Sequence, residues 1–130
     1  MSKIKGVLVN ANENGNRIEK HTAEIDSYTD YYKLLDCRVF DIQQRYVGDF
    51  IVDIYLDDEG LLKEAPIPTA ITVDKNEKIV EVLFGNLFFT QTDPEGETVS
   101  LSDEAINAVL ESQTVIFYKG SFYNVVRLNL

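Results

Sequence analysis

Hydrophobic and polar residues alternate most regularly between residues 39 and 57, on either side of a short polar turn at 47–49. Alternation with a period of two predicts β-strands with one buried face, so this segment is predicted to be a β-hairpin. The expected register pairs Tyr46 with Phe50. It places four side chains on the buried face, those of Phe40, Ile42, Ile54 and Leu56. It leaves three carboxylates pointing outward, those of Asp41, Asp53 and Asp57.

Two further hairpins are predicted, one at each end of the chain. Near the N-terminus, β-rich runs at Lys3–Val9 and Ile18–Ile25 flank a polar, Asn-rich segment that is typical of a loop. Near the C-terminus, runs at 114–118 and 122–128 flank Lys119-Gly120-Ser121. Strands close in sequence pair antiparallel, so these hairpins favour an antiparallel sheet.

Two short helices are predicted from capping residues followed by helical spacing. Ser27 is a candidate N-cap for a helix whose apolar face carries Tyr28, Tyr31, Tyr32 and Leu35. Ser102 is a candidate N-cap for a second helix, with Ile106, Val109 and Leu110 facing inward.

The segment between the second hairpin and the second helix is less clear. Pro66 and Pro68 restrict residues 65–69 to an edge strand or an extended loop. Residues 79–84 fit a strand or a helix equally well, 87–92 fit a strand, and 93–96 fit a tight turn. The whole chain, residues 1–130, is therefore expected to be a single α+β domain. Its sheet should be mostly antiparallel and twisted, built from hairpins, with two short helices.

Composition fits one folded domain and offers little catalytic chemistry. The chain has 130 residues, of which 45% are hydrophobic and 26% charged, both ordinary globular values. The only histidine and the only cysteine, His21 and Cys37, are too few for a common zinc site, though they could in principle form a nucleophilic dyad. Nucleotide-binding glycine motifs and the hydrolase nucleophile elbow are absent from the sequence. We therefore expect no catalytic residues, no metal, no cofactor and no enzymatic activity.

The location expected from the sequence is the cytoplasm of a bacterial host cell. The apolar run Val7-Leu8-Val9 is too short for a signal peptide core or a membrane span, and a single cysteine cannot form an internal disulfide.

Charge is distributed unevenly along the chain. The formal net charge is −10, but residues 21–111 carry 20 acidic and 6 basic residues, a net of −14, while each end has a net of +2. A chain of this charge is expected to bind a basic protein rather than nucleic acid or an anionic membrane. The acids would approach the charge density of duplex DNA only if they shared one face. Spread over all faces, they would serve solubility alone.

If the acids form an interaction surface, those of the central hairpin should lie near another acidic cluster, because a basic groove binds a contiguous field. The candidate residues are Asp41, Asp53, Asp57, Asp58, Glu59, Glu95, Glu97, Asp103 and Glu104.

Aromatic residues provide an alternative site. Most of the seven tyrosines are expected at the edge of the core, and the remainder would suit a protein interface or a stacked nucleobase. A nucleotide-like signal could bind such a pocket only if cationic side chains met its phosphate. The candidates are Arg17, Arg38, Arg45 and Arg127.

Three segments together resemble a known family. They are GDFIVDIYLDDEGLLKE at 48–64, FGNLFFTQTDPEGE at 84–97 and VSLSDEAI at 99–106. In this order they are similar to a small domain of unknown function found in phages, plasmids and Firmicutes (DUF3846). The resemblance covers about residues 3–112, and residues 113–130 look like a C-terminal hairpin addition.

The resemblance implies a mobile-element setting and supplies no catalytic residues. The function expected from the sequence is a non-catalytic accessory protein of a mobile element. It would bind a basic host defence or nucleic-acid-handling protein, such as a CRISPR effector or a restriction enzyme. In one version of this hypothesis it would do so by mimicking nucleic acid. The alternatives are a module that sequesters a small nucleotide signal and a protein-interaction module without a role in defence.

Overall fold

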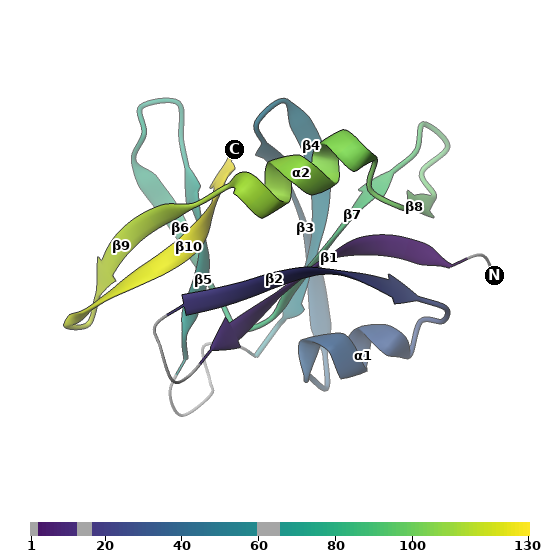
Figure 1. Ribbon diagram of the computed structural model, residues 1–130, viewed down its shortest axis with the longest axis horizontal. Helices are drawn as coiled ribbons and strands as arrows, with labels where there is room; N and C mark the ends of the chain where they lie inside the picture. The colour runs from purple at the N-terminus through teal and green to yellow at the C-terminus, as the bar shows by residue number, and fades with distance from the viewer. Residues whose placement is uncertain (1–2, 13–16, 60–65) are drawn as a thin grey trace.

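A computed structural model describes residues 3–12, 17–59 and 66–130 as ten β-strands and two short α-helices (Figure 1). In chain order the elements are β1 (Ile4–Asn12), β2 (Arg17–Ile25), α1 (Asp30–Leu35), β3 (Phe40–Val47), β4 (Phe50–Asp57), β5 (Pro68–Val73), β6 (Ile79–Phe84), β7 (Leu87–Thr92), β8 (Thr98–Val99), α2 (Asp103–Glu111), β9 (Thr114–Tyr118) and β10 (Ser121–Asn129). The expected α+β class, with a mostly antiparallel sheet and two short helices, is confirmed. The Asn-rich loop expected near residues 13–16 lies outside the described residues.

The strands form one sheet in the order β2-β1-β7-β4-β3-β10-β5-β6, with β8 added to β7 and β9 to β10. The described strand pairs are antiparallel apart from β10 and β5, which run parallel. Strands β1 and β2 cross in front of the other strands in Figure 1, and they approach β5 and β10. The sheet is therefore strongly curled.

The register of the β3–β4 hairpin differs by one residue from the expected one. Val47, not Tyr46, pairs with Phe50, so the loop contains only Gly48 and Asp49. Gly48 has a φ of +58°, which glycine adopts without a steric penalty, and hairpins favour such two-residue loops. Because strand side chains alternate between faces, a shift of one residue changes which side chains lie opposite each other.

The shift corrects the predicted burial of this hairpin. Ile54 and Leu56 are buried as expected. Ile42, however, lies opposite Tyr55 and remains 49% exposed, and Phe40 is only half-buried. Three acids were expected on the exposed face, and of these only Asp41 is exposed; Asp53 and Asp57 are buried.

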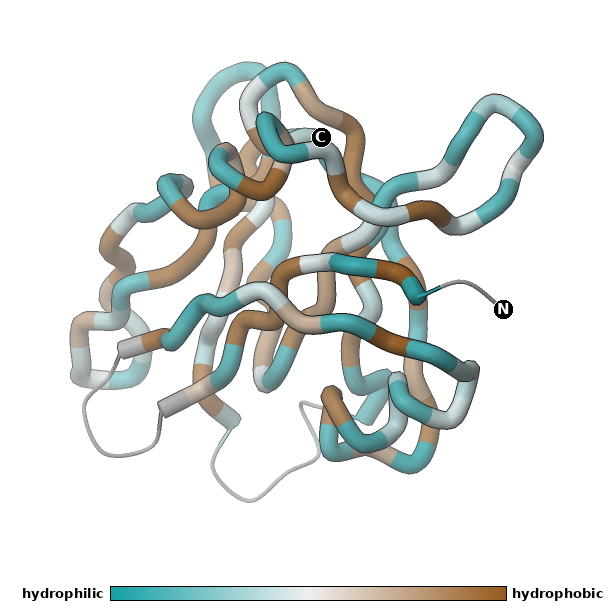
Figure 2. The backbone as a smooth tube through the Cα atoms, turned by 45° about the vertical axis from the view of Figure 1, so that its right-hand side comes forward, coloured by the Kyte–Doolittle hydropathy of each residue, from teal (hydrophilic) through white to brown (hydrophobic). Residues whose placement is uncertain are grey.

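Each face of the sheet is covered by one helix. Val52, Ile54 and Leu56 of β4 belong to the main core, which α2 covers with Ala105, Ile106 and Val109. Tyr55 points to the opposite face and packs in a second cluster with Leu8, Phe88 and two residues of α1, Tyr31 and Leu35. Figure 2 shows hydrophobic and hydrophilic residues mixed along the chain. The inner strand β5 and most of β7 are buried on both faces, so their buried residues do not follow a strict alternation.

One of the two predicted N-caps is confirmed, that of α2, whereas the N-cap of α1 is Thr29 and not Ser27 as expected. Ser102 Oγ accepts a hydrogen bond from Ala105 N at 3.1 Å, so the predicted N-cap of α2 is confirmed. Ile106 and Val109 are buried, but Leu110 is 37% exposed and does not face inward as expected. Helix α1 begins three residues after Ser27, at Asp30, whose carboxylate accepts hydrogen bonds from Asp26 N and Ser27 N.

The C-terminal end of α2 is capped from another element. Lys20 of β2 donates hydrogen bonds from Nζ to the carbonyl oxygens of Val109, Leu110 and Ser112, at 3.2, 3.0 and 2.6 Å. A cation at this position satisfies orphan carbonyls and complements the helix dipole. Burial lowers the pKa of the Lys20 ammonium below its usual value.

One segment is more central than the sequence indicated, and a second, ambiguous one is a strand at the edge of the sheet. Residues 68–73 form β5, a fully buried strand between β10 and β6, instead of an edge or a loop. Pro68 is its first residue, a position at which a strand tolerates proline. The ambiguous segment 79–84 is the strand β6, and the predicted strand and turn at 87–92 and 93–96 are confirmed.

The predicted C-terminal hairpin is confirmed as β9–β10, but it is not peripheral. Strand β10 lies between β3 and β5 and contributes Val125, Val126 and Leu128 to the buried interior. Removing the tail would expose the inner edges of two other strands.

Candidate functional site: an acidic groove between β3 and β6

A groove of about 290 Å³ lies where the sheet opens between β3 and β6. Its polar wall carries four carboxylates and one amide, those of Asp41, Asp57, Asp58, Glu81 and Gln43. Its apolar wall is formed by Leu56, Val82, Leu83 and Phe84. Three of the nine acids predicted as an interaction surface therefore share one groove.

The groove follows from the way the neighbouring strands pair. Strands β3 and β10 share a single residue pair, Tyr46 with Asn129, so β10 does not cover the other end of β3. The observed register places Asp41 opposite Leu56 and Gln43 opposite Ile54, so these polar side chains lie on the same face of the sheet as the main core, at its margin. The main apolar core ends here in a polar wall.

Glu81 is held in place by two hydrogen-bond donors. Arg45 Nη2 of β3 lies 3.2 Å from Glu81 Oε1 and 3.3 Å from Oε2, and Thr72 Oγ1 donates to Oε1 at 3.0 Å. The side chains of Arg45 and Glu81 are only 20% and 27% exposed, so this ion pair is partly shielded from solvent. It ties β3 to β6 across the groove.

The aspartates are oriented mainly by the backbone. Asp41 Oδ1 accepts a hydrogen bond from Ile42 N at 2.9 Å, and Asp57 Oδ1 accepts one from Glu59 N at 2.9 Å. Asp58 N donates to Val39 O at 3.1 Å, which fixes the turn after β4 against the start of β3. These contacts leave carboxylate oxygens on the wall of a defined hollow.

Two buried polar atoms at the groove have no hydrogen-bond partner within the described part of the chain: Gln43 Oε1 and Arg45 Nε. Gln43 Oε1 is a hydrogen-bond acceptor, as are the carboxylate oxygens around it. A wall dominated by acceptors fits a ligand that donates hydrogen bonds and carries positive charge, such as a guanidinium or an ammonium group.

The other predicted acids lie elsewhere. Glu59 adjoins the groove and accepts a hydrogen bond from Arg38 at 2.7 Å. Asp53 is buried on the opposite face of β4, where its carboxylate accepts hydrogen bonds from Thr92 Oγ1 and Gln44 Nε2.

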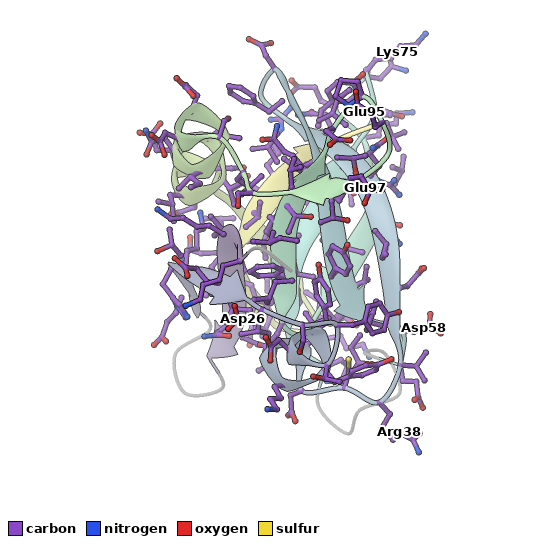
Figure 3. The ribbon with its side chains drawn as sticks, turned by 90° about the vertical axis from the view of Figure 1, so that its right-hand side faces the viewer. Asp26, Arg38, Asp58, Lys75, Glu95 and Glu97 are labelled. Atoms are coloured by element: carbon purple, nitrogen blue, oxygen red, sulfur yellow. The ribbon has the colours of Figure 1, made fainter. Side chains whose placement is uncertain are left out.

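The remaining four acids are exposed, at the β7–β8 turn and the first turn of α2; they are Glu95, Glu97, Asp103 and Glu104. Figure 3 shows Glu95 and Glu97 in the upper half of the molecule and Asp58 in the lower half. The structure therefore does not join the hairpin acids and the Glu95–Glu97 cluster into one field.

The groove was only partly predictable. Glu81 and Gln43 were missed: residues 79–84 fitted a helix as well as a strand, and the expected register of β3 did not place Gln43 on an inward wall. Once 79–84 is treated as a strand, the alternation that turns Leu83 inward does the same for Glu81.

The structure does not bring together the residues that a metal site or a His21–Cys37 dyad would need. Among the residues that the structure describes, no group of three or more His, Cys, Asp or Glu side chains is placed to hold a metal ion. His21 is exposed on β2 opposite Leu8, and Cys37 packs against the second cluster beside α1. Within the described ranges, neither helix is long and apolar enough to cross a membrane.

Comparison with known protein families assigns the chain to one of them. The model of the family described as "Domain of unknown function (DUF3846)" matches residues 4–114. The chain belongs to this family. The DUF3846 match includes both strands that form the groove and ends at the first residue of β9. Neither the curated proteins nor the solved structures compared with the chain gave a significant match.

Proposed function

We propose that this DUF3846 protein is a non-catalytic binding module that receives a basic side chain of a protein partner in the groove between β3 and β6. The observation that carries the proposal is the convergence of Asp41, Asp57 and Asp58 with Glu81 on one concave wall. Glu81 is held in that wall by its ion pair with Arg45.

The shape and charge of the groove agree with this role. A lysine or arginine has an aliphatic stem and a cationic head. The apolar wall of Leu56, Val82 and Phe84 would contact the stem, while the carboxylates and Gln43 Oε1 would accept hydrogen bonds from the head. A net charge of −10 would also raise the rate at which a basic partner arrives.

The proposal is for a local site and does not require mimicry of a DNA duplex. A duplex-like field would need the acids to be continuous, and Asp58 and Glu95 lie in opposite halves of the molecule (Figure 3). As partner we propose a host defence or nucleic-acid-handling protein, such as a CRISPR effector or a restriction enzyme, in the bacterial cytoplasm. The channels through which such proteins bind nucleic acid expose lysine and arginine.

The test compares two double variants with equal changes in charge. Asp41→Asn with Asp58→Asn removes two carboxylates from the groove, whereas Glu95→Gln with Glu97→Gln removes two from the β7–β8 turn. The probe is an arginine-rich peptide, titrated by calorimetry at low and high salt. We expect the groove variant to lose about tenfold or more in affinity and the control about threefold or less.

Equal losses in the two variants would show that general charge attracts the peptide, and the groove would then not be the site. Binding that survives high salt unchanged would also contradict the proposal, because exposed charge contacts are screened. Once the peptide result is in hand, the same variants can be used against purified CRISPR effectors and restriction enzymes to test the partner class.

A further inference from the structure

A second and larger pocket lies between α1, β4 and β8, with a volume of about 610 Å³. It shares no lining residue with the acidic groove. Its walls come from five parts of the chain and include Tyr28, Tyr31, Ile42, Tyr55, Glu97 and Thr98. The volume falls within the range usual for small-molecule sites.

Aromatic rings form one wall of this pocket. Tyr31 stacks on Tyr55 with ring centroids 4.1 Å apart and an interplanar angle of 14°, and Tyr28 meets Tyr31 edge-on at 6.0 Å. Tyr28 is 63% exposed and Ile42 is 49% exposed, although both line a concave surface. An exposed ring beside an exposed isoleucine offers a stacking surface that the fold itself does not cover.

Hydroxyl groups lie along the same wall. Tyr55 Oη and Thr98 Oγ1 are 3.3 Å apart, and the ring of Tyr31 stacks on that of Tyr55. Burial raises the pKa of Tyr31 above its usual value. Its hydroxyl is protonated at neutral pH, as in any tyrosine, and can both donate and accept a hydrogen bond. A ligand edge that both donates and accepts hydrogen bonds could join this chain of hydroxyls.

The charges around the pocket argue against a phosphate. One cation and one anion line it, Lys3 and Glu97, and Lys3 also lies 3.9 Å from Glu24. Three of the candidate arginines contact acids instead, with Arg38 at Glu59, Arg45 at Glu81 and Arg127 at Glu77, and none of these six residues lines the pocket. With a chain charge of −10, a nucleotide phosphate would meet repulsion here.

We infer that this pocket binds an uncharged planar heterocycle, a free nucleoside. The base would stack on the exposed ring of Tyr28 and the side chain of Ile42, and its polar edge would reach the hydroxyls of Tyr55 and Thr98. A nucleoside combines the flat apolar faces and the mixed donor and acceptor edge that these walls present. This site is independent of the proposed groove function.

The inference is tested by titrating the ¹⁵N-labelled protein with adenosine, uridine and adenosine 5′-monophosphate while recording amide spectra. We expect saturable shifts at Ile42, Thr98 and other pocket amides with at least one nucleoside, and weaker binding of the monophosphate. The inference is overturned if neither nucleoside gives saturable shifts, or if the monophosphate or a single-stranded oligonucleotide binds more tightly than the nucleoside.

Two matched variants locate the binding site. Ile42→Glu introduces a carboxylate into the pocket, while Ile51→Glu makes the same change at an isoleucine of the same hairpin, 46% exposed, that lies outside it. We expect Ile42→Glu to weaken nucleoside binding about tenfold or more and Ile51→Glu to change it by less than about threefold. If folded samples of the two variants bind equally well, the pocket is not the site.

Discussion

The rings of Tyr31 and Tyr55 stack with their centroids 4.1 Å apart and their planes 14° apart, so an aromatic pair fixes α1 to the inner strand β4. Tyr31 is 4% exposed and Tyr55 is 5% exposed. Helix α1 has only six residues, which is too short to be stable alone, so its position depends on this contact and on Leu35.

The Tyr31 contact predicts a loss of stability at alkaline pH. Burial raises the pKa of Tyr31 above its usual value of 10.0, so above that pH the unfolded chain releases a proton that the folded chain retains. The free energy of unfolding should therefore fall as the pH rises above 10.0, by up to about 1.4 kcal/mol per pH unit from this residue.

Denaturant unfolding at a series of pH values measures this effect. Tyr31→Phe should flatten the alkaline decline, whereas Tyr46→Phe, at a tyrosine that is 41% exposed, should leave it as in the parent protein. Identical alkaline profiles for the parent and Tyr31→Phe would contradict the prediction.

The observed register predicts opposite outcomes for two isoleucines of one hairpin. Ile54 is fully buried in the main core, so Ile54→Ala should cost about 2–5 kcal/mol of unfolding free energy. Ile42 is 49% exposed, so Ile42→Ala should cost well under about 1 kcal/mol. Urea denaturation of both variants makes the comparison. Similar costs for the two variants would favour the register expected from the sequence, which pairs Tyr46 with Phe50 and buries Ile42.

Asp53 should be a structural carboxylate. It is buried and accepts hydrogen bonds from Thr92 and Gln44, so Asp53→Asn places an amide group where two donors need an acceptor. We expect a cost of about 1–3 kcal/mol in unfolding free energy. Asp49→Asn, at the exposed hairpin tip, is the control and should be nearly silent. A silent Asp53→Asn would mean that this carboxylate is solvated.

Lys20 should stabilise α2 by capping its C-terminal carbonyls. Lys20→Met keeps most of the aliphatic stem and removes three hydrogen bonds, so we expect a loss of about 1–2 kcal/mol in unfolding free energy. Lys5→Met removes an exposed lysine from the neighbouring strand and should cost much less. Thermal melts followed by circular dichroism report both values. Equal shifts in melting temperature for the two variants would show that the hydrogen bonds of Lys20 do not stabilise α2.

Salt should raise the melting temperature while it weakens peptide binding. The chain carries a net charge of −10, and the groove gathers four carboxylates, so screening relieves repulsion in the folded state. The double variant Asp41→Asn with Asp58→Asn should show a smaller rise over the same range of sodium chloride. A melting temperature that does not respond to salt would show that the acids are too widely spaced to repel each other.

The sequence predicted those features that depend on neighbouring residues. The strand at 50–57, the turn at 93–96 and the Ser102 cap each concern contacts within a few positions, and these predictions held, although the expected outward positions Asp53 and Asp57 are buried. The acidic character and the family match likewise belong to the chain itself.

The tertiary structure decided the faces and the long-range neighbours. A difference of one residue in the hairpin register exposes Ile42 and places Asp41 and Gln43 on the face of the main core, because side chains alternate along a strand. Similarly, no local pattern shows that β10 runs parallel to β5 or that β6 faces β3 across a groove. Those placements depend on burying both faces of a curled sheet at once, a condition that only the complete fold can satisfy.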